Sequence, residues 1–78
     1  MNTNLNDAQN AIVEYLKMLV ERRNEATEEL KYSESVDPNS KFVEAGLKRE
    51  NDREAELQRG WKLALDAGIE PRIVYQYR

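Results

Sequence analysis

One cluster of turn-forming residues divides this chain into two segments of helical length. It spans residues 32–40 and reads Tyr-Ser-Glu-Ser-Val-Asp-Pro-Asn-Ser, and serine, aspartate, asparagine and proline favour turns and helix caps. Neither proline nor glycine occurs before it. Apolar side chains recur there in steps of three, four and seven residues, at Leu5, Ala8, Ile12, Leu16, Leu19, Ala26 and Leu30. These steps predict one helix over residues 5 to about 32, with Asn4 as its N-cap.

A second helix is predicted from about residue 38 to residue 67. Asp37 can act as its N-cap, and Pro38 fits the first helical position, where a missing N–H is harmless. A short connection makes consecutive helices antiparallel neighbours. The predicted fold class is therefore all-α, an antiparallel two-helix hairpin that forms a single domain over residues 1–78.

The end of the second helix is the clearest boundary in the sequence. Gly68 fits the left-handed position that often follows a helix, Ile69 can make the apolar contact of a Schellman motif, and Pro71 cannot continue the helix. Residues 69–78 are expected to form a short strand or extended C-terminal arm, because the side chains of residues 72–78 alternate in character. One side of this arm would carry the residues that we predict to bind a partner, Ile73, Tyr75 and Tyr77.

Two helices alone share only one thin seam. Folding the hairpin at the predicted turn places Leu16 near Leu57, Ile12 near Gly60 and Trp61, and Leu5 near Ala67. Residues 11–20 present apolar groups over more than one stripe, which is typical of a helix with two neighbours. We therefore expect a homo-oligomeric helical bundle; the alternative is a monomer whose C-terminal arm folds back over the exposed face. The predicted packing and oligomer residues are Ile12, Leu16, Leu19, Leu57, Gly60 and Trp61.

The middle of the predicted hairpin is polar where a seam should be apolar. Glu50, Arg53 and Glu54 interrupt the apolar stripe of the second helix for about two turns. These charges either form structural ion pairs in a solvated seam or, with Arg22 and Arg23, line a pocket for a charged ligand, within one chain or across a subunit boundary. In the second case the ligand-binding residues would be Arg22, Arg23, Lys48, Arg49 and Arg53.

Cysteine and histidine are both absent from the chain. Their absence removes disulfides, zinc sites built from these residues, thiol catalysis and the commonest general base. Helical spacing brings some carboxylates together, namely Glu25 with Glu28 or Glu29, and Glu50 with Glu54. Beside basic residues and without histidine, such pairs are typical of solvated faces. We therefore expect no enzymatic activity, no metal and no cofactor.

The charge distribution also limits the partners. The 12 basic and 15 acidic residues are interleaved and leave a net charge of −3, so no basic excess indicates DNA binding. No apolar run approaches the ~18 residues of a membrane span, and the N-terminus lacks the regions of a signal peptide. A cytoplasmic protein without membrane association is expected.

A short part of the second helix resembles a known family. Residues 57–61, Leu-Gln-Arg-Gly-Trp, are followed by Leu63 and Leu65 and resemble the late second-helix signature of phage helical-hairpin nucleotide sponges, which counter CBASS and Thoeris defences. The chain is also similar to them in size and in having an aromatic residue, Phe42, soon after the turn. Phe42 lies about two helical turns farther from this signature than the family pattern implies, and the C-terminal arm also departs from it. Only four residues are carried over, mainly as packing residues: Leu57, Gln58, Gly60 and Trp61.

The resemblance implies a homo-oligomer that sequesters cyclic nucleotide signals without cleaving them. The leading hypothesis is a non-enzymatic, phage-encoded anti-defence protein that binds a host signal or a host factor in the host cytoplasm. Two alternatives stay open at this point. The first alternative is a direct protein–protein inhibitor or adaptor that uses its C-terminal arm. The second is a structural coiled-coil assembly element.

Overall fold

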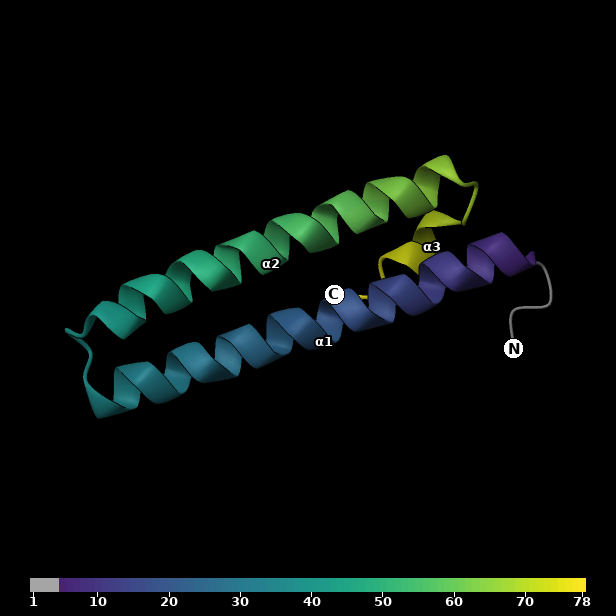
Figure 1. The fold of residues 1–78 in the computed structure, drawn as a ribbon. Coiled ribbons are helices and arrows are strands. Elements are labelled where there is room, and N and C mark those ends of the chain that lie inside the picture. Colours follow the sequence, from purple (N-terminus) through teal and green to yellow (C-terminus); the bar gives the residue numbers. More distant parts are fainter. Residues whose placement is uncertain (1–4) are drawn as a thin grey trace.

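The protein is described by a computed structural model of residues 5–78, which form three helices (Figure 1). The two long helices, α1 (Asp7–Val36) and α2 (Lys41–Asp66), lie side by side and run antiparallel. A single turn of helix, α3 (Pro71–Val74), follows α2. Residues 5–78 contain no strand, and none of their helices combines the length and apolarity needed to cross a membrane. The predicted all-α antiparallel hairpin is therefore confirmed.

The first helix begins two residues later than predicted. Asn6 is its N-cap, because its side-chain Oδ1 accepts a hydrogen bond from the Gln9 N–H at 2.8 Å, while Gln9 Oε1 accepts one from the Asn6 N–H at 3.1 Å. This reciprocal pair is a capping box. The predicted cap, Asn4, lies outside the described residues. Gln9 also donates from Nε2 to the carbonyl oxygen of Ala67 at 2.8 Å, which joins the open ends of the two long helices.

The turn between the long helices differs from the prediction in its caps. Asp37 ends α1 as its C-cap, so the prediction that it opens the second helix is wrong. The Asp37 side chain accepts a hydrogen bond from the Asn39 N–H at 3.1 Å, and its carbonyl oxygen accepts one from the Ser40 N–H at 3.1 Å. Pro38 and Asn39 are thus the central residues of a β-turn, a position that suits proline. α2 begins at Lys41, after this turn.

The predicted end of the second helix is confirmed. Gly68 has φ 85°, a left-handed conformation that favours glycine. Its N–H donates to the Leu65 carbonyl at 3.0 Å, and the Ile69 N–H donates to the Ala64 carbonyl at 3.1 Å. These two bonds define a Schellman motif. Ile69 is buried, so the apolar contact expected of this residue is also made.

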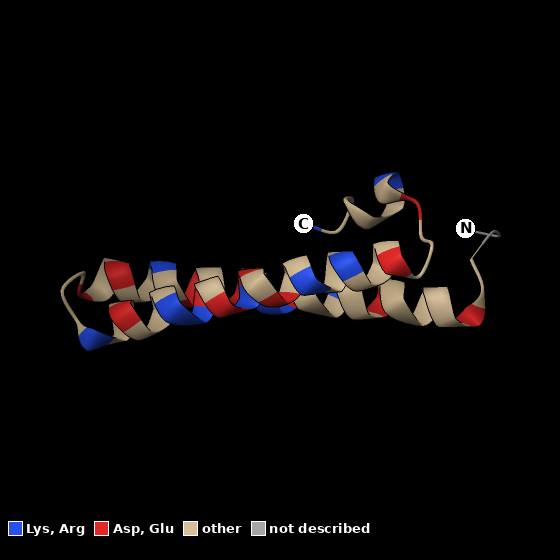
Figure 2. Ribbon diagram, turned by 90° about the horizontal axis from the view of Figure 1, so that it is seen from above, with Lys and Arg blue, Asp and Glu red and all other residues tan. Residues whose placement is uncertain are grey.

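The C-terminal arm is neither a strand nor extended, and that prediction is wrong. Pro71 occupies the first position of α3, where its fixed φ suits a helix. Val74 is fully buried, so the arm folds back onto the hairpin, as the monomer alternative required. Figure 2 shows α3 lying to one side of the two long helices. The alternation of side chains did not decide the structure, because the residue that the arm buries most completely lies between the tyrosines and Ile73.

The core lies toward the open end of the hairpin, where α3 adds a third element. Its buried side chains are Val13, Leu16, Leu19, Leu57, Ala64, Ile69 and Val74. A Cβ built on Gly60 would lie 2.7 Å from Leu19 Cδ1 and 3.0 Å from Leu16 Cδ2. Gly60 therefore faces Leu16 and Leu19 rather than Ile12. The predicted register is wrong by about one helical turn, because α1 continues to Val36.

Candidate functional site

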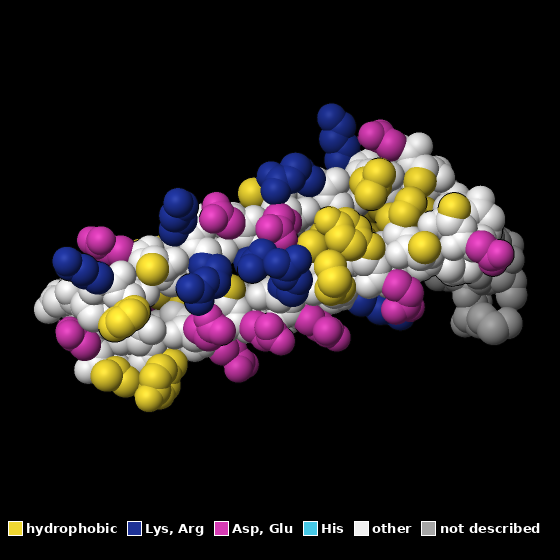
Figure 3. Space-filling model, in the orientation of Figure 1, with side chains coloured by type: hydrophobic (Ala, Val, Ile, Leu, Met, Phe, Trp, Pro, Cys, Tyr) yellow, Lys and Arg dark blue, Asp and Glu magenta, His cyan; other side chains and the backbone are white. Residues whose placement is uncertain are grey.

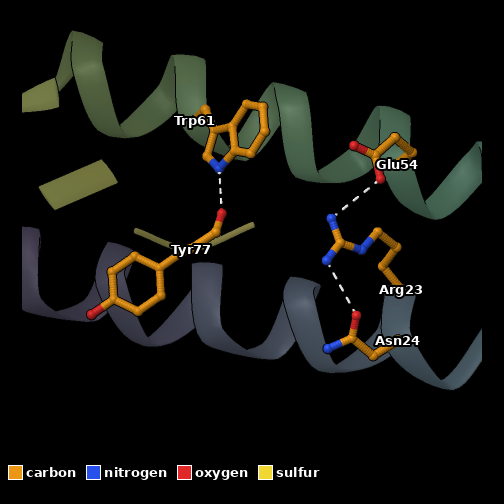
Figure 4. Close-up of polar contacts among 5 residues, drawn as sticks. All are labelled: Arg23, Asn24, Glu54, Trp61 and Tyr77. Atoms are coloured by element: carbon orange, nitrogen blue, oxygen red, sulfur yellow. Dashed lines mark hydrogen bonds and ion pairs between the residues drawn. The ribbon is translucent and has the colours of Figure 1, made fainter. Parts of the chain in front are cut away.

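The polar middle of the hairpin contains ion pairs between the helices. Arg23 of α1 points across the seam to Glu54 of α2, with Nη1 3.4 Å from the Glu54 carboxylate, and its Nη2 donates to Asn24 Oδ1 at 3.2 Å (Figure 4). The register predicted from the sequence, in which Leu16 lies near Leu57, would place Arg23 opposite Arg49 and Glu50 instead. The register difference explains the change of partner. With only 19% of its side chain exposed, Arg23 serves the seam rather than an open site.

A second group of charges lies beside this seam. Glu56 accepts from Arg53 at 3.0 Å along α2, and its other oxygen lies 3.8 Å from Arg22 of α1. Farther toward the turn, Arg49 of α2 pairs with Glu29 of α1 at 2.5 Å. The polar middle is thus a layer of ion pairs, the first of the two interpretations drawn from the sequence.

Three of the five predicted ligand-binding residues nevertheless gather around one surface hollow. Arg22, Arg49 and Arg53 line it together with Glu25, Ala26 and Glu29, and its volume is about 270 Å³. We call this the arginine hollow. Lys48 lines a neighbouring hollow with Asp52 and Arg53 instead. Arg49 and Arg53 are one turn apart on α2, and Arg22 reaches the hollow from α1, where it lies 3.8 Å from Glu56 of α2.

A second hollow of about 460 Å³ adjoins the arginine hollow toward the turn. Tyr32 and Phe42 form part of its wall, and Glu29 and Arg49 line both hollows. We call it the aromatic hollow. Phe42 is 78% exposed and Tyr32 is 72% exposed, so neither ring is needed for the core. Sequence reasoning missed Tyr32 because it assigned this residue to the turn. The available signal was a pair of aromatic residues on the two sides of the turn, Tyr32 before it and Phe42 ten positions later.

The two hollows are open, and the ion pair that they share contributes little to the stability of the fold. Arg49 and Glu29, which they share, have half-exposed side chains (52% and 60%), and such surface pairs contribute little to stability. Three arginines and two glutamates line the arginine hollow, so its ionisable side chains carry one more positive than negative charge. Within residues 5–78, no group of acidic side chains could hold a metal ion.

The predicted packing residues serve the core of a single chain. Leu16, Leu19 and Leu57 are buried, and Gly60 lets α1 approach α2. Trp61 also contacts this core, as does Ile12.

The predicted partner arm is held against the hairpin rather than free. Trp61 Nε1 donates to the Tyr77 carbonyl oxygen at 2.7 Å (Figure 4). The rings of Trp61 and Tyr75 meet edge to face, with centroids 5.5 Å apart. Ile73 and the Tyr77 side chain pack against the core. Tyr75 is the exposed aromatic side chain of this arm, whereas an extended arm of the predicted kind would form only if these contacts were broken.

Comparison of the chain with protein-family models, with curated proteins and with solved structures found no match. The inference about function therefore depends on the two hollows and on the residues that surround them.

Proposed function

We propose that this protein is a non-enzymatic binding protein that sequesters an anionic, aromatic small molecule of the cyclic nucleotide class. The observation that carries the proposal is the position of the aromatic hollow directly beside the arginine hollow, with Glu29 and Arg49 in both walls. Exposed aromatic rings are stacking platforms for bases. Guanidinium groups bind phosphate oxygens in a bidentate fashion. A ligand that carries both a base and phosphate groups would therefore use both hollows.

Sequestration fits these hollows better than turnover. Their ionisable side chains are arginines, glutamates and Tyr32, and the chain offers neither histidine nor cysteine as base or nucleophile. The resemblance to phage nucleotide sponges favours the same ligand class. Under this proposal the protein is phage-encoded and lowers the concentration of a host defence signal in the host cytoplasm.

The direct test is calorimetric titration with a panel of cyclic dinucleotides and trinucleotides. We expect saturable binding of at least one member, and chromatography of the released ligand should recover it intact. Phe42→Ala should weaken that binding by about tenfold, since stacking on an aromatic ring contributes ~1–3 kcal/mol per base. Arg49→Gln should also weaken it, through loss of a guanidinium shared by both hollows.

Arg59→Gln is the matched control for Arg49→Gln. It removes the same charge from an exposed position of α2 that lines neither hollow, so the affinity should stay within about twofold of the parent protein. Absence of binding across the whole panel would refute the cyclic nucleotide proposal. Equal losses in Arg49→Gln and Arg59→Gln would place the ligand elsewhere.

A further inference from the structure

The hairpin has one broad face that α3 leaves uncovered. Val13 and Val20 pack in the cluster that contains Val74 of α3. Tyr15 lies on another side of α1, since two residues correspond to a rotation of about 200° from Val13. Its ring reaches the seam, with Cε2 3.9 Å from the Cβ position of Gly60. Tyr15 therefore belongs to the open face.

This face presents two apolar patches separated by charges. The open-end patch consists of Tyr15, Met18 and Leu63, and the turn-end patch of Tyr32, Val36 and Phe42; all six are exposed. Figure 3 shows hydrophobic side chains near the turn and again toward the open end, with basic and acidic side chains between them. Exposed apolar groups arranged in this way mark an interaction surface.

Two ion pairs between the patches have opposite directions across the hairpin. Near the open end, the cation Arg22 is on α1 and the anion Glu56 is on α2. Near the turn, the anion Glu29 is on α1 and the cation Arg49 is on α2. If a second hairpin is placed on this face and turned end for end, Arg22 of one copy meets Glu29 of the other. Arg49 likewise meets Glu56.

The rest of α2 follows the same symmetry. The point midway between Arg49 and Glu56 lies between Asp52 and Arg53, and the same point is midway between Phe42 and Leu63. A two-fold axis through this point therefore brings Phe42 of one copy onto Leu63 of the other, and Asp52 onto Arg53. On α1, Met18 and Tyr32 are equally distant from Glu25, so Met18 of one copy meets Tyr32 of the other.

We propose that two copies of this chain pack face to face and antiparallel about this axis, as a four-helix bundle with an isologous interface. Apolar patch meets apolar patch twice, and each charge named on α2 meets its opposite. A parallel arrangement would also bring Arg22 of one copy over Glu56 of the other, and Arg49 over Glu29, because these residues face each other in the hairpin register. It would, however, place Glu25 of each copy over Asp52 of the other, which makes two like-charge contacts. Among the charges named here, the antiparallel dimer makes one like-charge contact, between Glu25 of one copy and Glu25 of the other. Arg22 and Arg53 line the same hollow as Glu25 and therefore lie close enough to offset this repulsion.

The first experiment measures the mass of the unliganded protein by sedimentation equilibrium. We expect a particle of twice the 9.1 kDa chain mass. Leu63→Glu should weaken association at least about tenfold, because it places a charge in the apolar contact. The variant should keep its helical circular dichroism, since Leu63 is exposed in the single chain. A particle of one chain mass at about 100 µM would overturn the proposal.

The orientation is tested by disulfide cross-linking, for which the chain has no competing cysteine. Asp52→Cys lies beside the axis, so two copies should form a disulfide-linked dimer under mild oxidation. Lys62→Cys, on an exposed part of α2 remote from the axis, is the control and should stay monomeric under denaturing electrophoresis. An unlinked Asp52→Cys protein of dimeric mass, or equal linking of both variants, would refute the antiparallel arrangement.

The two tests of the dimer do not depend on ligand binding, because both use the protein alone. Failure of the nucleotide titrations would therefore leave it untouched, and a monomeric protein would leave the titrations interpretable. Both hollows lie on the covered face, so a nucleotide that binds there must change the dissociation constant of the dimer.

Discussion

Replacing Gly60 with alanine tests how closely the two long helices approach each other. The new Cβ would lie 2.7 Å from Leu19 Cδ1 and 3.0 Å from Leu16 Cδ2, distances that require the leucines to move. Leu16 and Leu19 are 0% and 1% exposed, so they are surrounded by packed side chains rather than by solvent. Interiors of this density hold little free volume for such a movement.

The expected magnitude follows from two opposing effects. Alanine favours a helix interior by ~1 kcal/mol over glycine, whereas overpacking a core costs ~1–3 kcal/mol. Because the Cβ of Gly60→Ala contacts two buried leucines, we expect the upper part of that range. The free energy of unfolding should therefore fall by about 1–2 kcal/mol.

Gly46→Ala is the matched control, because it makes the same chemical change on the same helix. Its Cβ would lie 3.1 Å from Leu30 Cδ1, a milder contact beside the open aromatic hollow, which Gly46 itself lines. Only the end of the Leu30 side chain has to shift, by a few tenths of an ångström, because Leu30 Cα and Cβ lie at 3.6 Å, an ordinary contact distance. The gain in helix propensity should then dominate, and the free energy of unfolding should rise by about 0.5 kcal/mol.

Both variants can be measured by urea unfolding followed with far-ultraviolet circular dichroism. The parent and variant proteins must be compared at one concentration, because self-association would shift the apparent stability. The prediction is a difference in sign between positions 60 and 46. If Gly60→Ala stabilised the protein as much as Gly46→Ala, the close approach of α1 to α2 at Gly60 would be refuted.

Three further predictions concern the helix ends, the arm and one ion pair. Asn6→Ala removes the capping box and should lower stability by about 1 kcal/mol, with faster amide exchange only in the first turn of α1. Truncation after Glu70 removes α3 and should shift the fluorescence of Trp61 to the red. The free energy of unfolding should fall by about 2 kcal/mol from the loss of the buried Val74 alone. Removal of Arg78 only is the control and should change neither the fluorescence nor the stability. The hydrogen bond to Glu14 raises the pKa of Lys17 above 10.5, so Glu14→Gln should lower that pKa in an NMR titration. Because the folded pKa is raised, the pair's contribution to stability is present below pH 10.5 and is lost above it.

The two long helices could be predicted from the sequence because their signals are local and repeated. Apolar spacing over many turns identified both, and Gly68 identified the end of α2 through backbone stereochemistry that few other residues can adopt. The turn was less certain for a physical reason. Asp37-Pro38 suits both the start of a helix and the first half of a β-turn. The side chain of Asp37 bonds to Asn39 in the turn, and this choice is not visible in the sequence.

The C-terminal arm could not be predicted because its structure depends on tertiary contacts. Seven residues with alternating character are a weak strand signal, and an isolated strand has no neighbour with which to form hydrogen bonds. Val74 instead finds a place in the core that α1 and α2 have already formed. Trp61 then fixes the end of the arm by its bond to the Tyr77 carbonyl. Neither contact has a local sequence signal.

In the candidate site, the set of residues that share a face depends little on the register of the two helices, whereas the pairing of their charges depends on it strongly. A shift of one turn moves each residue to a neighbour on the same face, so Arg22, Arg49 and Arg53 share a hollow despite the error in register. Pairing is more sensitive, and Arg23 finds Glu54 instead of the predicted neighbours. Tyr32 became part of the site only because α1 continues past it to Val36. The composition of the face therefore follows from periodicity, whereas the partners of its charges follow from the lengths of the helices.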